Sequence, residues 1–190
     1  MKRLFFCLAL MCTLGLVKAQ KLEVKIVQDG ATVLPKDDVY VLSPKTFSFE
    51  IKSAGVEGFL VGVTTDEYIY KSALGEADLE VMWFDETGMA ESLFNADKEV
   101  FVNDEAPSYW YFTSTKDHRF DVGAKGNGKL WQATRTVDSF YYMTKEESMS
   151  VKEVKEPLYF FFYLPTYDED YNLLDKKCIF KAQLSLTNTL

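Results

Sequence analysis

Hydrophobic and polar residues alternate with a period of two along much of the chain. The clearest case is Thr46 to Lys52, where Phe47, Phe49 and Ile51 occupy every second position and polar residues lie between them. Successive side chains of a strand point to opposite faces. The pattern therefore predicts a strand with one buried face and one face in solvent.

A second pattern occupies residues 158–164, where seven apolar residues stand between Pro157 and Pro165. The run is too short to cross a bilayer as a helix, which takes about 20 residues. Aromatic residues at both odd and even positions indicate a strand that is covered on both faces. Prolines cannot donate to a strand ladder, so they fit its ends. We expect a central strand here.

Shorter apolar or alternating runs predict further strands, at 22–26, 39–42, 58–63, 79–84, 99–102, 109–113, 129–137, 140–143 and 178–184. Turn signals separate them, above all the glycine-rich segment 123–128. One short helix is predicted at 87–94. Many short strands with few helical periods indicate an all-β protein, a single-domain β-sandwich of the Ig-like or jelly-roll-like kind.

The first 19 residues have the pattern of a secretory signal peptide. Lys2 and Arg3 precede an apolar segment at 4–17, and Val17-Lys18-Ala19 suits a cleavage site. We expect residues 20–190 to form the mature domain, with no transmembrane segment. Removal of residues 1–19, which hold three cations and no acid, takes the formal net charge from −8 to −11. Such a charge disfavours nucleic acids and anionic lipid surfaces as partners.

Cysteine usage bears on both compartment and stability. Cys7 and Cys12 leave with the predicted signal, so Cys178 is the single cysteine of the mature chain and no intrachain disulfide can form. The chain also has no Asn-x-Ser/Thr acceptor. We therefore expect a bacterial periplasmic or secreted protein. Cys178 shares a parity with Phe180, Ala182 and Leu184, which predicts a buried, inert thiol.

The candidate ligand-binding residues are aromatic or basic and come from two segments: Tyr109, Trp110, Tyr111, His118, Arg119 and Trp131. An imidazole near a carboxylate such as Asp121 suits acid–base chemistry. The alternative is a core strand followed by a loop in which Arg119 pairs with Asp121, and core packing is the usual role of such aromatics. Exposed tryptophans would instead be able to stack on sugars.

Metal sites have few ligands to draw on. One histidine and one mature cysteine disfavour a transition metal. The acidic segment around Asp168 and Asp170 makes calcium the alternative cofactor, although its spacing differs from the twelve-residue calcium loop. A solvated acidic loop is the favoured interpretation.

These patterns favour an exported, soluble β-sandwich that acts as a binding or interaction module for an unknown protein or carbohydrate partner, without catalytic activity. The alternative is a small secreted hydrolase or carbohydrate-active protein that uses His118 with an acidic partner. The sequence has no Gly-x-Ser-x-Gly elbow, which disfavours the hydrolase.

We predict that the exported protein begins at Gln20, because the cleavage pattern ends at Ala19. Intact-mass measurement of the protein recovered from outside the cytoplasm should give the mass of residues 20–190, or that mass less ammonia if Gln20 cyclises. A mass that includes residues 1–19 would contradict the prediction.

Overall fold

The computed structural model describes residues 21–76, 99–102, 109–111, 122–127, 130–142, 145–170 and 173–187. The signal segment 1–19, the predicted strand at 79–84 and the predicted helix at 87–94 lie outside these ranges. Among the described residues, no helix has the length and apolar character that crossing a bilayer requires.

The described strands form two sheets. The five-stranded sheet has the order β2-β1-β4-β9-β8, with bounds Ala31–Val33, Lys21–Gln28, Phe47–Ala54, Leu130–Val137 and Val122–Asn127. The eight-stranded sheet has the order β11-β10-β6-β5-β12-β13-β3, with bounds Glu147–Ser150, Ser139–Tyr142, Glu99–Val102, Gly58–Thr64, Leu158–Tyr167, Leu173–Leu186 and Val39–Leu42. Its remaining strand, β7 (Tyr109–Tyr111), pairs with β5.

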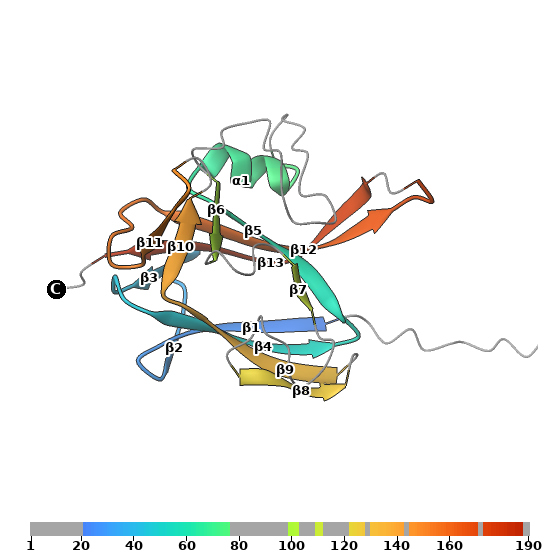
Figure 1. Cartoon of the computed structure of the whole chain (residues 1–190), viewed down its shortest axis with the longest axis horizontal. Helices are drawn as coiled ribbons and strands as arrows, with labels where there is room; N and C mark the ends of the chain where they lie inside the picture. The colour runs from blue at the N-terminus through green and yellow to red at the C-terminus, as the bar shows by residue number, and fades with distance from the viewer. Residues whose placement is uncertain are drawn as a thin grey trace, which may run out of the picture.

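The two sheets lie in separate layers, with the five-stranded sheet below the eight-stranded one in Figure 1. All described neighbours are antiparallel except β13 and β3, which are parallel. The chain passes from β9 in one sheet to β10 in the other across Asp138 alone. The predicted all-β class is confirmed, whereas the Ig-like or jelly-roll-like type stays a prediction.

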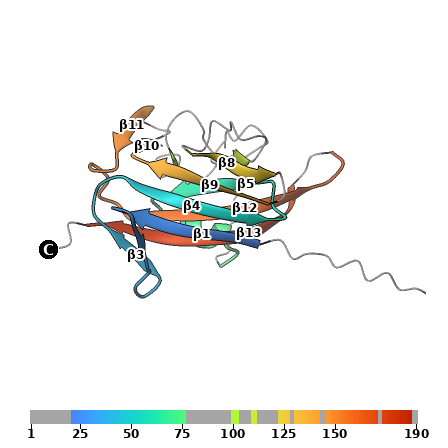
Figure 2. The same ribbon diagram turned by 90° about the horizontal axis from the view of Figure 1, so that it is seen from below.

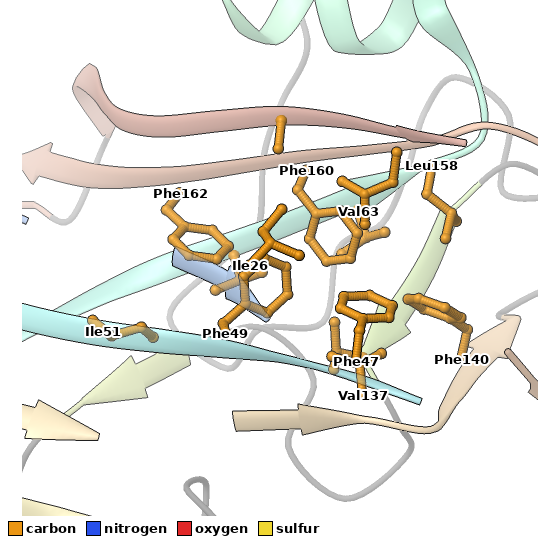
Figure 3. Close-up of a cluster of buried hydrophobic side chains, with 14 of the residues drawn as sticks. Ile26, Phe47, Phe49, Ile51, Val63, Val137, Phe140, Leu158, Phe160 and Phe162 are labelled. Atoms are coloured by element: carbon orange, nitrogen blue, oxygen red, sulfur yellow. The ribbon is translucent and has the colours of Figure 1, made fainter. Parts of the chain in front are cut away.

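The core lies between the sheets and is dominated by phenylalanine rings. Phe49 of β4 is fully buried, and its ring centroid lies 5.1 Å from that of Phe160 and 5.5 Å from that of Phe162, both on β12 (Figure 3). These pairs have the edge-to-face geometry that aromatic rings favour. The alternation predicted for 46–52 is confirmed, because Phe47, Phe49 and Ile51 are buried while Glu50 and Lys52 are exposed.

Strand β12 lies in the interior of its sheet, between β5 and β13, as predicted for the run at 158–164. The expectation that Pro165 ends the strand is wrong: β12 continues to Tyr167, beyond its pairing with β5, and Pro165 lies opposite Lys176 of β13. Phe160 and Phe162 face the core, while Tyr159, Phe161 and Tyr163 occupy the opposite face and are also buried. The expectation that both parities of this run are covered is therefore confirmed.

Helix α1 (Glu67–Ala73) lies on the outer face of the eight-stranded sheet (Figure 1). Asp66 caps it, because its carboxylate accepts hydrogen bonds from the backbone N–H of Tyr68 at 2.8 Å and of Ile69 at 3.3 Å. The ring of Tyr70 packs 5.1 Å from that of Tyr159. The sequence pattern did not predict this helix, since seven residues give only about two turns of periodicity.

Strand β13 departs from the predicted alternation. Phe162 pairs with Phe180 and Tyr163 pairs with Cys178, so Ile179 is an extra residue that forms a β-bulge. The bulge reverses the parity of the residues before it. The prediction that Cys178 is buried with Phe180 and Ala182 is therefore wrong: Cys178 is exposed.

Close packing requires glycine at position 62. Gly62 of β5 is the cross-strand partner of Phe161, whose ring lies where a Cβ atom on residue 62 would stand. A glycine in a strand marks this kind of close approach. The aromatic side chain of β12 thus covers the backbone of β5.

Phe49→Ala should lower the free energy of unfolding by about 3–5 kcal/mol, because it removes a fully buried ring and leaves a cavity. Ser48→Ala, on the opposite face, loses only a half-buried hydroxyl contact to Thr136 and should cost no more than about 1 kcal/mol. Denaturant titration of both variants measures the difference. Equal losses would contradict the assigned faces.

Gly62→Ala should lower the free energy of unfolding by about 1–3 kcal/mol, because the new methyl group overlaps the Phe161 ring. In the double variant with Phe161→Leu, the loss should be smaller than the sum of the two single losses, because the smaller side chain makes room. A double-mutant cycle measures this coupling. Additive losses would show that the ring does not limit position 62.

Candidate functional site

Of the predicted site residues, Tyr109, Trp110 and Tyr111 form β7, whose backbone pairs with β5 from Gly58 to Leu60. His118 and Arg119 lie outside the described residues. The proximity of the imidazole to a carboxylate, on which the hydrolase hypothesis depends, therefore stays a prediction.

Trp131 is a core residue. It is buried, and its indole N–H donates a hydrogen bond of 2.7 Å to the carbonyl oxygen of Val56. Its ring is stacked on Phe59 with an interplanar angle of 7°. Since the face of a sugar-binding ring must be accessible, Trp131 offers no stacking platform in this structure.

Asp168 and Asp170 lie beyond the end of β12, at the tip of the long β12–β13 hairpin that projects from the body of the protein in Figure 1. The Asp168 carboxylate accepts a hydrogen bond of 2.9 Å from the Asp170 backbone N–H, which is the geometry of an Asx turn. Among the described residues there is no group of three or more His, Cys, Asp or Glu side chains arranged to hold a metal. Calcium binding stays a prediction.

Cys178 lies on the outer face of β13, near the end of α1. Lys181 on the same strand forms a salt bridge of 3.3 Å with Glu76, which follows α1. Desolvation by the packing around its sulfur raises the pKa of the Cys178 thiol, the hydrogen bond to the Phe180 carbonyl and the charge of Lys181 oppose the rise, and the Glu76 carboxylate makes the smallest contribution, which is a raising one. A raised pKa leaves little thiolate near neutral pH, which disfavours a nucleophilic role.

Tyr70 shares this environment. Burial raises the pKa of its phenol to about 12, with contributions from Cys178 and Glu76. A phenol with this pKa is neutral at physiological pH. Tyr70 packs between the helix and the sheet. Its neutral phenol offers no base for proton transfer.

A concavity lies on the outer face of the five-stranded sheet, the face nearer the viewer in Figure 2. It is an open hollow of about 250 Å³ over β4, β9 and β8. Its lining residues are Glu50, Ile51, Lys52, Lys125, Gln132, Ala133 and Thr134. Ile51 and Ala133 have buried side chains, so mainly their backbone contributes to the floor.

Strand pairing explains how the five polar side chains meet. Gln132 of β9 lies opposite Lys52 of β4 on one side and opposite Lys125 of β8 on the other. Thr134, two residues further along β9, lies opposite Glu50. Directly paired residues of an antiparallel sheet share a face. All five side chains therefore project to solvent from three adjacent strands.

A bulge in β8 shapes one wall of the hollow. Val122 pairs with Thr134 and Lys125 pairs with Gln132, so β8 has one more residue than β9 between these two pairs. Bulges bend a strand and re-aim its side chains, and they are frequent beside binding sites. Lys125 is thereby placed at the rim.

We call this concavity the polar hollow and define it by the side chains of Glu50, Lys52, Lys125, Gln132 and Thr134. These side chains are not engaged with other described residues. None of the five side chains takes part in the hydrogen bonds or ion pairs found in the described part of the chain. Their donors and acceptors are therefore available to a ligand.

Sequence reasoning placed Glu50 and Lys52 on a solvent face but did not identify them as site residues. Alternation also separates Gln132 and Thr134 from the buried Trp131 and Ala133. The glycine-rich segment 123–128, predicted as a turn, is largely strand β8, so Lys125 was not expected on a sheet face. The strand order was also missing, since the pattern does not place β4 beside β9.

Comparisons with known proteins give no match: no family model, no curated protein and no solved structure is significantly similar to this chain.

The thiol of Cys178 should react with Ellman's reagent in the native protein beginning at Gln20, because the residue is exposed. The reaction rate should increase with pH, and the pH at half-maximal rate should be higher than for a small-molecule thiol. The reason is that the raised pKa of Cys178 leaves less reactive thiolate at a given pH. Cys178→Ser is the control for labelling. No reaction before unfolding, or a midpoint below that of the free thiol, would contradict the environment described.

Proposed function

We propose that this protein is an exported binding module that holds a small polar ligand in the polar hollow. The observation that carries the proposal is the convergence on one concavity of five polar side chains from β4, β9 and β8, none of which is bound to another described residue. Convergent polar groups that fix the orientation of a ligand are one element of a small-molecule site.

The scaffold suits binding without rearrangement. Strands β4 and β9 are paired over eight residues, from Phe47 to Ala54, and the opposite face of β4 is anchored in the core by Phe47, Phe49 and Ile51. Side chains on paired strands are held more rigidly than those on loops, which lowers the entropy cost of binding. A ligand therefore needs only to displace water from the hollow.

The compartment is part of the proposal. The charged start, apolar segment and cleavage pattern of residues 1–19 support export, and the acidic mature chain suits a soluble periplasmic or secreted protein. A binding module in that compartment would meet small nutrients or fragments of envelope polymers, and both classes are polar.

The test is a screen of small polar molecules against ¹⁵N-labelled protein by amide chemical shifts. We expect at least one molecule to shift amides of β4, β8 and β9 at the lining residues. Thr134→Tyr, which fills the hollow, should abolish these shifts. Thr32→Tyr adds the same ring at an exposed position of β2 and should leave them unchanged. Shifts confined to another surface, or a library without any hit, would overturn the proposal.

A further inference from the structure

We infer that the polar hollow selects a small molecule with a carboxylate at one end and a hydrogen-bond donor, a hydroxyl or an ammonium group, a few ångström away. This inference rests on the proposed function and assigns the chemical class of its ligand. It comes from the order of charges across the three strands.

One row of the hollow carries two lysines, and Glu23 of β1 borders this row opposite Lys52. Lys52, Gln132 and Lys125 stand side by side on β4, β9 and β8, because both lysines pair with Gln132. Neighbouring strands are about 4.8 Å apart, so the two lysine Cα atoms stand about 10 Å apart with the amide between them. The flexible four-carbon stems let both ammonium groups lean toward one anion above Gln132.

The second row has the opposite character. Glu50 and Thr134 form a cross-strand pair two residues along from the row of the two lysines, which corresponds to about 7 Å along a strand. An ionised carboxylate only accepts hydrogen bonds. Glu50 therefore favours a donor group on the ligand and repels a second anion, while the Thr134 hydroxyl can donate or accept.

Within the hollow the rows place two positive charges at one end and one negative charge at the other. On the neighbouring strand β1, Glu23 lies opposite Lys52 and Lys25 lies opposite Glu50, and these two side chains form a salt bridge of 3.7 Å with each other. A carboxylate bound over the lysines brings its own donor group to Glu50 when the two groups are about 4–7 Å apart, the spacing set by successive outward positions. A ligand with anions at both ends meets repulsion at Glu50. A neutral ligand leaves the lysines without a partner.

The lining also sets the polarity of the ligand. Among the described residues, none of the side chains that line the hollow is aromatic, and the described lining offers charged and hydrogen-bonding groups. Binding depends on charge-assisted hydrogen bonds in an open, hydrated setting, where each exposed ion pair contributes little. We expect affinities on the order of millimolar, with a marked dependence on ionic strength.

Two classes of small molecule carry a carboxylate together with a hydrogen-bond donor a few ångström away. An acidic sugar carries a carboxylate and ring hydroxyls, and an amino acid carries a carboxylate and an ammonium group. The probes are therefore glucuronate and β-alanine, with glucose as the neutral match of the first and acetate as the carboxylate without a second group. Each is titrated into ¹⁵N-labelled protein at low and high salt.

We expect glucuronate, β-alanine or both to bind at least about fivefold more tightly than glucose and acetate. Lys52→Gln and Lys125→Gln should each weaken the better probe about two- to fivefold, as expected for one exposed charge pair. Glu50→Gln should reduce the advantage of that probe over acetate. Lys152→Gln removes an exposed lysine outside the hollow and should change nothing. If glucuronate binds more tightly than β-alanine, the natural ligand is an acidic sugar; if β-alanine binds more tightly, it is an amino acid.

The outcomes separate this inference from the function on which it rests. Shifts at the hollow that are as strong with glucose as with glucuronate, or that survive both lysine substitutions, would overturn the ligand class while leaving a binding site in place. No shift at the hollow with any of the four probes would overturn the class as well. The broader screen with Thr134→Tyr then decides whether the hollow binds anything.

Discussion

The ring of Phe49 between Phe160 and Phe162 joins the two sheets, and the other features of the structure depend on that contact. It fixes which face of β4 points inward, and with it the outward direction of Glu50 and Lys52. Arg135 makes a second link, since its buried guanidinium donates a hydrogen bond of 3.3 Å from β9 to the Val102 carbonyl of β6. The core thus positions the polar face.

The two sheets use their outer faces differently. The eight-stranded sheet buries both faces of β12, and α1 packs on its outer side through Tyr70 and Tyr159. The five-stranded sheet presents exposed Glu50, Lys52 and Gln132 outward. Because side chains on that face remain hydrated, a ligand there gains little from apolar burial and must be recognised by its charge and hydrogen bonds.

Two titratable groups on the outer face of the eight-stranded sheet differ from the polar hollow in their chemistry. Desolvation raises the pKa of the Tyr70 phenol to about 12 and that of the Cys178 thiol, whose residue as a whole is exposed, so both groups are predominantly neutral at physiological pH. Catalysis requires groups that change protonation or attack near the working pH. The polar hollow instead combines fixed charges of both signs on paired strands, an arrangement that suits selective binding.

The sequence by itself predicted several of the strands, such as 46–52 and 158–164, and which of their faces are buried, because a period of two and a two-sided apolar run depend only on neighbouring residues. It did not predict β8, because the glycine-rich segment 123–128 resembles a turn, nor the short strands β2 and β11. It did not determine the side of Cys178, since a single-residue bulge at Ile179 reverses the alternation and depends on pairing with β12. It missed α1, whose two turns give little periodicity. It also could not assemble the polar hollow: Lys52 and Lys125 are 73 positions apart in the printed sequence, and only the pairing of both with Gln132 brings them into one row. Strand order and register are set by contacts between distant residues, so the tertiary structure alone decided them.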